Sequence, residues 1–145
     1  MPRGFIDTAA VVKLYRNEPD SMAVVACVDV LDELIIAPIT PLEFHFAFAI
    51  MVRMGVLTER EARVHLDAFD NEVGRFRILS ATESIFSTAL SLVDTHGMDQ
   101  GLRPLDAIQL ASALDENDVK PIDMFITTDK LLATVASMEG FVVQP

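Results

Sequence analysis

Residues 34–43, Leu34-Ile35-Ile36-Ala37-Pro38-Ile39-Thr40-Pro41-Leu42-Glu43, join a short apolar run to the start of a helix. The run over 34–37 contains no polar residue, which is typical of a strand buried on both faces of a parallel sheet. Thr40, Pro41 and Glu43 provide an N-cap hydroxyl, a proline at the first helical position and an acid at the third, and together they predict a capping box. We therefore expect a strand over 34–37 and, directly after it, a helix that runs to Met54 and ends at Gly55.

Strand and helix signals alternate along the rest of the chain. Apolar runs and caps predict further strands over 4–7, 76–79, 124–127 and 141–143, and helices over 8–15, 21–33, 58–71, 82–96, 104–117 and 130–139. Gly97 and Gly140 are expected to end two of these helices, and Thr58 to open another with a second capping box. Strands separated by helices require right-handed crossovers. The sequence thus predicts an α/β domain over 1–145, with a mainly parallel five-stranded sheet covered by helices on both faces.

Composition excludes several classes of protein. The 145 residues, 51% of them hydrophobic, with a mean hydropathy of +0.36, are enough for one domain with a sizeable core and exclude a disordered chain. No apolar run is long enough to span a membrane, and residues 1–4 lead into the first strand without a secretion signal, so we expect a cytoplasmic protein. The single cysteine, Cys27, cannot form an internal disulfide and is expected to be a buried small hydrophobe.

The net charge limits the ways in which the protein can meet a nucleic acid. The chain has 22 acidic and 11 basic residues, hence a formal charge of −11, which excludes broad electrostatic coating of DNA or RNA. Carboxylates that converge on divalent cations invert the local sign of the charge, however. A metal-dependent nuclease therefore stays compatible with the composition.

Four acidic residues lie at the same edge of the predicted sheet. Asp7 ends the first strand, Glu43 lies in the first turn after the second, Asp106 is in the first turn of the helix that Pro104 opens, and Asp129 follows the strand over 124–127. In open parallel sheets, ligands bind beyond the carboxyl ends of the strands. The four acids are therefore candidates for a binding site.

Each of these acids has a simpler explanation when it is taken alone, because carboxylates cap helices and are favoured by the helix dipole. Their combination changes the interpretation. Two carboxylates about 4 Å apart repel by about 4 kcal/mol at an effective dielectric constant of 20, so a group of four favours a bound cation or a shared proton. Oxygen ligands point to Mg²⁺ or Mn²⁺, ions that commonly bind through one or two carboxylates together with waters and a phosphate. The pattern favours phosphodiester hydrolysis.

Four segments that carry these acids resemble the PIN domain, and especially the VapC-type toxins. They are Phe5–Tyr15, Ile39–Phe44, Leu102–Ala111 and Phe125–Leu132, and the resemblance extends over the whole chain. It implies a three-layer α/β/α sandwich and an endoribonuclease with RNA as its substrate and a divalent metal held by the acids. It also implies the toxin of a toxin-antitoxin pair, restrained by a cognate VapB-type antitoxin.

The resemblance also assigns roles to single residues. Asp7, Glu43, Asp106 and Asp129 match the acidic quartet of the family, and Thr8 and Thr127 match hydroxyl residues that help to place a metal or a water. We expect direct metal contacts from Asp7 and Asp106, and from Glu43 and Asp129 either metal contacts through water or orientation of the attacking water. Arg103 is the preferred candidate for positioning a phosphate.

Two questions stay open at the level of the sequence. The alternative to an enzyme is a catalytically silent PIN-like module that binds a protein partner through its apolar helices. The helix after Thr40 has apolar residues on nearly every face, so it is either central to the core or buried in a contact with another subunit or partner. We favour a homodimer or partner interface there.

Overall fold

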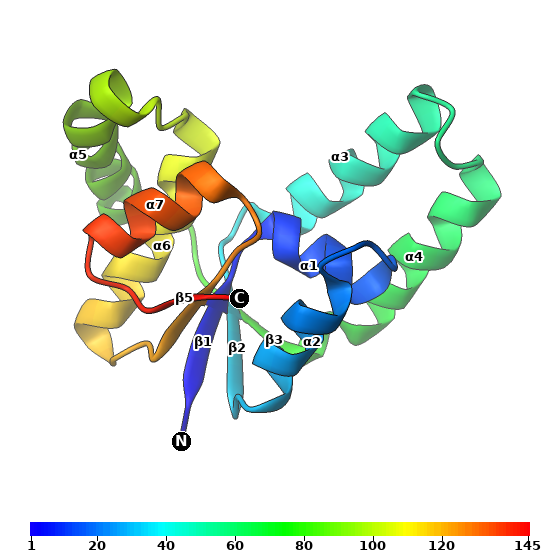
Figure 1. Ribbon diagram of the computed structural model, residues 1–145, viewed down its shortest axis with the longest axis horizontal. Coiled ribbons are helices and arrows are strands. Elements are labelled where there is room, and N and C mark those ends of the chain that lie inside the picture. Colours follow the sequence, from blue (N-terminus) through cyan, green and yellow to red (C-terminus); the bar gives the residue numbers. More distant parts are fainter.

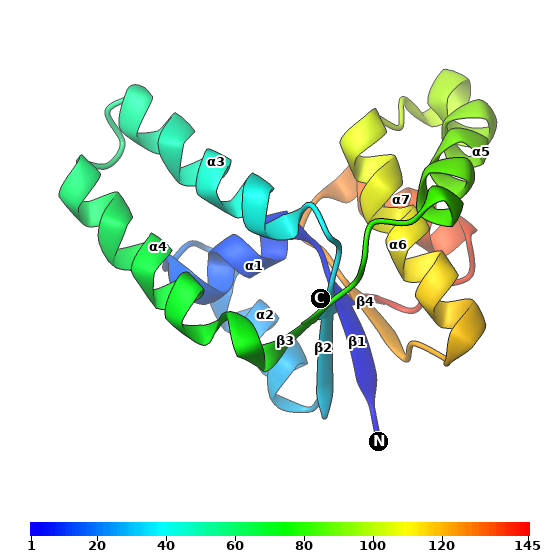
Figure 2. The same ribbon diagram turned by 180° about the vertical axis from the view of Figure 1, so that it is seen from behind.

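A five-stranded parallel sheet with the strand order β3-β2-β1-β4-β5 forms the centre of the computed structural model, which describes residues 1–145 (Figures 1 and 2). The strands are β1 (Arg3–Ile6), β2 (Glu33–Ile36), β3 (Phe76–Ile78), β4 (Met124–Ile126) and β5 (Val143–Gln144). The helices are α1 (Thr8–Tyr15), α2 (Ser21–Asp29), α3 (Thr40–Arg53), α4 (Glu59–Glu72), α5 (Glu83–Gln100), α6 (Pro104–Val119) and α7 (Lys130–Met138), with a 3-10 turn, η1 (Val73–Arg75). The predicted α/β/α architecture is confirmed, and the sheet is parallel throughout.

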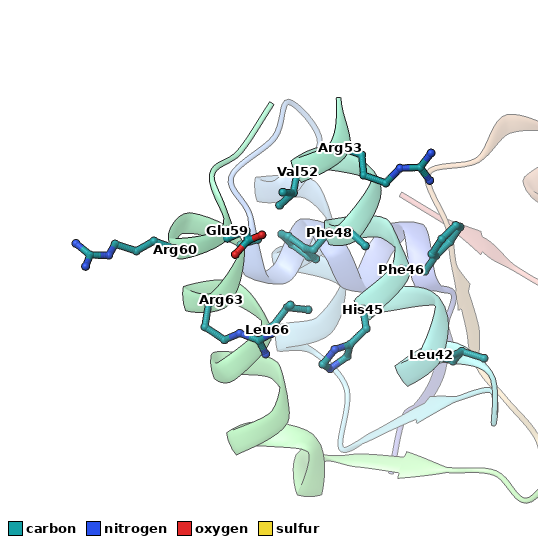
Figure 3. A pocket seen from close by; sticks show the side chains of 12 residues that line it. Leu42, His45, Phe46, Phe48, Val52, Arg53, Glu59, Arg60, Arg63 and Leu66 are labelled. Atoms are coloured by element: carbon teal, nitrogen blue, oxygen red, sulfur yellow. The ribbon is translucent and has the colours of Figure 1, made fainter. Parts of the chain in front are cut away.

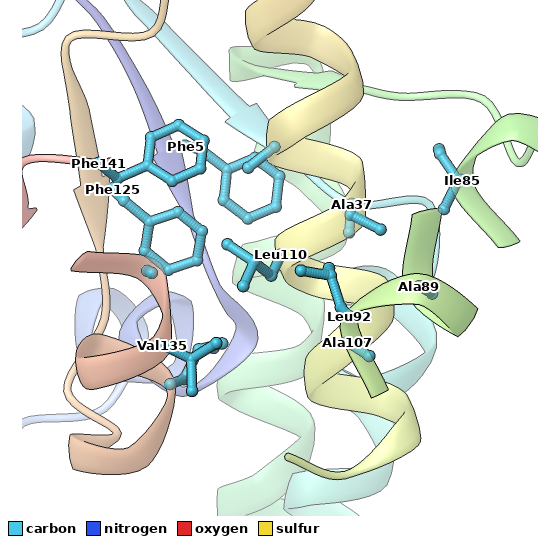
Figure 4. Close-up of a cluster of buried hydrophobic side chains, with 14 of the residues drawn as sticks. Phe5, Ala37, Ile85, Ala89, Leu92, Ala107, Leu110, Phe125, Val135 and Phe141 are labelled. Carbon is cyan, nitrogen blue, oxygen red and sulfur yellow. The ribbon is translucent and has the colours of Figure 1, made fainter. Parts of the chain in front are cut away.

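The two faces of the sheet are covered by different helices. Phe5 of β1 and Phe125 of β4 stack at a centroid distance of 5.2 Å and pack with α5, α6 and α7 on one face (Figure 4). Their neighbours Ile6 and Ile126 point to the other face, where they pack with α1, α2, α3 and α4. All four side chains are fully buried. This double burial explains why the strands read as continuous apolar runs in the sequence.

Strand β1 lies in the middle of the sheet, between β2 and β4. The chain leaves β1 towards β2 through α1 and α2, and the strand on its other side, β4, is reached only much later in the sequence. The chain leaves the carboxyl end of β1 for α1 on one face of the sheet, and it leaves the carboxyl end of the adjacent β4 for α7 on the other face. The carboxyl ends of β1 and β4 therefore border the point where the connections of the sheet separate. That place is the usual ligand site of an open α/β sheet.

The amino end of β1 carries a buried charge network. Arg3 is 2% exposed, and its guanidinium forms ion pairs with Glu33 of β2 and Glu116 of α6. Its Nη1 also donates to the carbonyl oxygens of Lys120 and Pro121, at 2.6 and 3.2 Å. Arg3 thus joins two strands to the end of α6, on the edge of the sheet that lies opposite the four acids.

Some of the predicted helix ends were wrong. Helix α5 passes through Gly97 and ends at Gln100, where Gly101 takes a φ of 75°, because a glycine inside a helix weakens it by only about 1 kcal/mol and does not by itself stop it. Helix α2 ends at Asp29 rather than near Glu33, because the amides of Asp32 and Glu33 donate to the carbonyl of Pro2 and enter the sheet.

The two predicted capping boxes had different outcomes. The box at Thr58 is confirmed, since Thr58 and Glu61 each accept a hydrogen bond from the other's amide, at 3.1 Å. The box at Thr40 is wrong: α3 has no side-chain cap, and the carboxylate of Glu43 is bonded elsewhere.

Two expectations concerned the environment of the chain rather than its helix ends. Cys27 is partly exposed rather than buried. No helix of the chain combines the length and the apolar character needed to cross a membrane.

Candidate functional site

The four predicted acids border one pocket at the carboxyl edge of the sheet, which we call the acidic pocket. It has a volume of about 580 Å³ and is formed by α1, α3, the start of α6 and the junction between β4 and α7. Its polar lining residues are Asp7, Thr8, Glu43, Asp106, Gln109 and Asp129. An apolar wall that includes Leu42, Phe46 and Leu105 completes it. The structure therefore brings together residues that are far apart in the sequence.

Asp7 follows β1 directly, lines the acidic pocket and is 3% exposed. Its Oδ1 accepts a hydrogen bond from the amide of Ala10 at 2.9 Å and so caps α1, and its Oδ2 accepts one from the hydroxyl of Thr127 at 2.6 Å. Burial raises the pKa of Asp7 to about 7, and the charges of Asp129 and Asp106 add to this rise, while the two hydrogen bonds oppose it. Asp7 is thus a buried acid with no cationic partner.

Glu43 projects from the first turn of α3. Its Oε1 accepts hydrogen bonds from the hydroxyl of Thr8 and from Nε2 of Gln109, both at 2.8 Å. Its Oε2 has no hydrogen bond to the protein. One oxygen of this carboxylate is therefore anchored while the other is left for a ligand.

Gln109 is a residue of the site that the sequence reasoning missed. It lies on α6, one turn after Asp106, and is 2% exposed. Besides Glu43, its Nε2 contacts the hydroxyl oxygens of Thr8 and Thr40, at 3.0 and 3.1 Å. A polar residue within the apolar run over 107–111, one turn away from an acid of the quartet, was the available signal.

Asp106 and Asp129 share one cation, Arg103. Nη2 of Arg103 lies 2.9 Å from Oδ2 of Asp106 and 3.4 Å from Oδ2 of Asp129. Burial raises the pKa of Asp106, and the hydrogen bond and charge of Arg103 oppose this rise. Asp129 also caps α7 by accepting the amide of Leu132 at 3.0 Å, and its own amide donates to Thr127 at 3.0 Å. Arg103 is 67% exposed, so it covers the two acids from the solvent side.

The donor set suits a hard divalent cation, although the side chains do not form a ready-made cage. No three acidic, histidine or cysteine side chains converge as ligands of one ion. Mg²⁺ and similar ions usually take one or two carboxylates and complete their shell with waters and substrate oxygens. Burial raises the pKa of Asp7, and the charges of Asp129 and Asp106 raise it further. These charges, and the guanidinium held by Asp106 and Asp129, indicate a place that favours a cation. The residues present therefore fit such an ion chemically.

A second pocket, of about 840 Å³, lies between α3 and α4 (Figure 3). Phe48 and Leu66 lie between the two helices, whereas Leu42 and Phe46 point away from α4 (Figure 3). Leu42 and Phe46 border both pockets and are 74% and 58% exposed. The apolar side chains of the helix expected after Thr40 thus face in different directions: Phe44 and Phe48 belong to the core, whereas Phe46 is exposed.

Comparisons with known proteins agree with this architecture. The PIN domain family matches residues 4–137 of the chain. A comparison with curated proteins found no match. Among solved structures, FitAcB from Neisseria gonorrhoeae is similar with a TM-score of 0.68 and 17% identity, over 98% of this chain and 96% of that chain.

Two further structures carry descriptions of their activity or assembly. VapC20 from Mycobacterium tuberculosis, described as a toxin that cleaves the sarcin-ricin loop, has a TM-score of 0.68 and 17% identity, over 98% of this chain and 99% of its own. A toxin-antitoxin complex from Klebsiella pneumoniae has a TM-score of 0.58 and 16% identity, over 87% of this chain and 86% of that chain. At these identities the likeness shows the fold alone.

Proposed function

Because the chain belongs to the PIN domain family, we propose that it is a metal-dependent endoribonuclease that hydrolyses phosphodiester bonds in RNA. The observation that carries this proposal is the acidic pocket, where four carboxylates from separate parts of the chain border one cavity at the carboxyl edge of the sheet. Helix capping accounts for Asp7 and Asp129 when each is taken singly. It gives no reason for all four carboxylates to border one cavity, where like charges repel. A site for a divalent cation and a phosphate gives such a reason.

We assign the direct metal contacts to Asp7 and Asp106, with Mg²⁺ or Mn²⁺ as the ion. When bound, such an ion supplies positive charge for the scissile phosphate and lowers the pKa of a water molecule. Thr127 orients Asp7 through its 2.6 Å hydrogen bond, and the amide of Ala10 holds the other oxygen. Asp7 therefore presents a fixed carboxylate, which reduces the reorganisation needed when the substrate binds.

The remaining residues act on the water and on the phosphate. Oε2 of Glu43 has no partner in the protein, which supports a role for it as the acceptor of a hydrogen bond from the attacking water, with Thr8 holding the other oxygen. Asp129 is assigned to contacts through water. The guanidinium of Arg103 binds a phosphate oxygen after it leaves the two acids, since its pairing with them is exposed and correspondingly weak.

We further propose that the protein is the toxin of a toxin-antitoxin pair, with a cognate VapB-type antitoxin and a homodimeric state. The exposed Leu42 and Phe46 support a protein partner at α3, because large apolar side chains that cluster on a surface often mark an interface. One of the similar structures is described as a toxin-antitoxin complex. Light scattering of the purified chain, alone and with the product of a neighbouring gene, tests both expectations, and a monomer in both samples would contradict them.

Replacement of Asp106 by asparagine tests the enzymatic proposal. We expect Asp106→Asn to reduce RNA cleavage in Mg²⁺ or Mn²⁺ by at least about 100-fold, because one of the two carboxylates assigned to the metal is lost, and with it the charge that the metal supplies to the transition state. Without metal, the melting temperature should change little, since the ion pair that is lost involves a largely exposed Arg103. Asp118→Asn, at an exposed position on the same helix, is the matched control and should cleave normally.

Two outcomes would redirect the interpretation. Unchanged cleavage in Asp106→Asn would contradict the assigned role of the acidic pocket. If calorimetry of the wild-type protein shows no heat with millimolar Mg²⁺ or Mn²⁺, and RNA stays intact, the chain is better described as a catalytically silent PIN-like module that binds a protein partner.

A further inference from the structure

We infer that Gln109 is a positioning residue that fixes Glu43 in the acidic pocket, an inference that rests on the proposed nuclease function. Gln109 belongs to α6 and Glu43 to α3, and these helices lie on opposite faces of the sheet (Figures 1 and 2). Their side chains meet at the carboxyl edge, where Nε2 of Gln109 donates to Oε1 of Glu43 at 2.8 Å. The contact thus sets the position of one acid relative to the helix that carries another, Asp106.

The amide group of Gln109 is the centre of a small polar cluster. Its Nε2 lies within 3.1 Å of Glu43, Thr8 and Thr40, and the hydroxyl of Thr8 donates to the same Oε1 of Glu43. An amide nitrogen has two hydrogens, so it serves two of these three oxygens at a time. Oε1 of Glu43 accepts hydrogen bonds from two protein donors, the hydroxyl of Thr8 and Nε2 of Gln109, whereas Oε2 accepts none.

The chemistry of the pair defines which end of the amide faces Glu43. An ionised carboxylate only accepts hydrogen bonds, whereas a glutamine offers a donor at Nε2 and an acceptor at Oε1. If Oε1 of Gln109 faced Glu43, two acceptor oxygens would confront each other. The donor end, Nε2, must therefore point to Glu43. Oε1 of Gln109 then points away from Glu43, whether or not a donor is available there.

This orientation is unfavourable for stability. Oε1 of Gln109 is the one buried side-chain oxygen or nitrogen of the chain without a hydrogen-bond partner. A buried polar atom that loses its hydrogen bonds to water and gains none destabilises the folded state. The residues beside it in the helix, Ala107, Leu110 and Ala111, are fully buried and apolar. An apolar side chain would remove this unpartnered oxygen, but it would also remove the donor that Gln109 supplies to Glu43, Thr8 and Thr40. The glutamine is explained by this donor.

Three variants separate this role from a structural one. Gln109→Leu keeps the approximate volume and removes the donor together with the unpartnered oxygen. Gln109→Glu keeps the shape but replaces the donor by a second carboxylate oxygen. Ser112→Ala, one turn further along α6, is the matched control, because Ser112 is also buried but bonds only to the carbonyl of Ile108.

We expect the melting temperature of metal-free Gln109→Leu to stay close to that of the wild type, because the variant removes the unpartnered oxygen but also the donor to Glu43 and to the buried hydroxyl of Thr40. Its affinity for Mn²⁺ by calorimetry, or its kcat for RNA at saturating Mn²⁺, should fall about 10- to 100-fold, because Glu43, which reaches the metal through water, loses one of the two donors that hold it, and losses of this size are usual for hydrogen-bonding partners around a metal site. KM for RNA should change little. Gln109→Glu should lose at least as much, because two carboxylates then face each other, and Ser112→Ala should retain both properties.

Other outcomes would overturn the inference and can be told apart from failure of the proposed function. If the wild type cleaves RNA and Gln109→Leu does so with equal kcat and Mn²⁺ affinity, Gln109 has no positioning role although the nuclease assignment stands. If the wild type binds Mn²⁺ but does not cleave RNA, the nuclease proposal fails. A weaker Mn²⁺ affinity of Gln109→Leu would in that case still support the positioning role. If the wild type neither binds nor cleaves, both proposals fail.

Discussion

Asp7→Asn is expected to stabilise the metal-free protein at pH 8 and to abolish its cleavage of RNA. The pKa of Asp7 is raised from 3.8 to about 7, mainly by burial, so ionisation of this carboxylate opposes folding. Asparagine has nearly the same shape, carries no charge, and its oxygen is able to accept the amide of Ala10 that caps α1. Stability and activity should therefore change in opposite directions in this one variant.

The effect on stability depends on pH with a definite sign. Below about pH 4, Asp7 is protonated in both the folded and the unfolded chain, and the charge penalty is absent. Between pH 4 and 7 the unfolded chain loses its proton first, so the wild type loses stability as the pH rises. Above pH 7 both states are ionised and the penalty is complete, at up to roughly 4 kcal/mol for three pKa units.

Urea denaturation of the wild type and of Asp7→Asn at pH 4, 6 and 8 measures this dependence. The stability gain of the variant should be small at pH 4 and largest at pH 8. Addition of Mn²⁺ should stabilise the wild type by mass action and leave the variant almost unchanged. A gain that does not vary with pH, or a variant that is less stable at pH 8, would contradict the assignment of Asp7 as a buried charge. Cleavage should fall by at least about 100-fold.

Arg3→Ala is expected to destabilise the protein by about 3–5 kcal/mol, because it leaves the buried Glu116 without its nearest cation. The same change removes the donors to the carbonyls of Lys120 and Pro121. Natural domains are stable by only about 5–15 kcal/mol, so this loss would take a large share of the total. Equilibrium unfolding in urea at pH 7 measures it.

Two further variants separate the buried charge from ordinary surface effects. Arg77→Ala removes a half-exposed arginine that pairs with the same acids, Glu33 and Glu116, and should cost less than about 1 kcal/mol. The double variant Arg3→Met with Glu116→Met replaces the pair by apolar side chains and should recover much of the loss. If Arg3→Ala unfolds at the same urea concentration as Arg77→Ala, Arg3 does not have the role inferred from its burial.

Most of the fold could be predicted from local sequence signals. The predicted strands over 34–37 and 124–127 match β2 (Glu33–Ile36) and β4 (Met124–Ile126) to within one residue at each end, because a strand buried on both faces requires consecutive apolar residues. The predicted end of the helix α5 was wrong, because a second glycine, four residues after the one expected to end it, ends the helix instead. Gly97 stays helical although glycine often ends helices. The helix continues to Gln100, and the next residue, Gly101, adopts the left-handed conformation that ends it.

The sequence by itself determined that the four acids lie at one edge of a parallel sheet, because this placement follows from the order of strands and helices alone. Only the tertiary structure decided what each carboxylate contacts. Glu43 was expected to close a capping box within its own helix, but it is bonded to Thr8 and to Gln109, which are 35 and 66 residues away. Caps and apolar periods act over a few residues and can be read from the chain, whereas such contacts depend on how the helices of both faces meet.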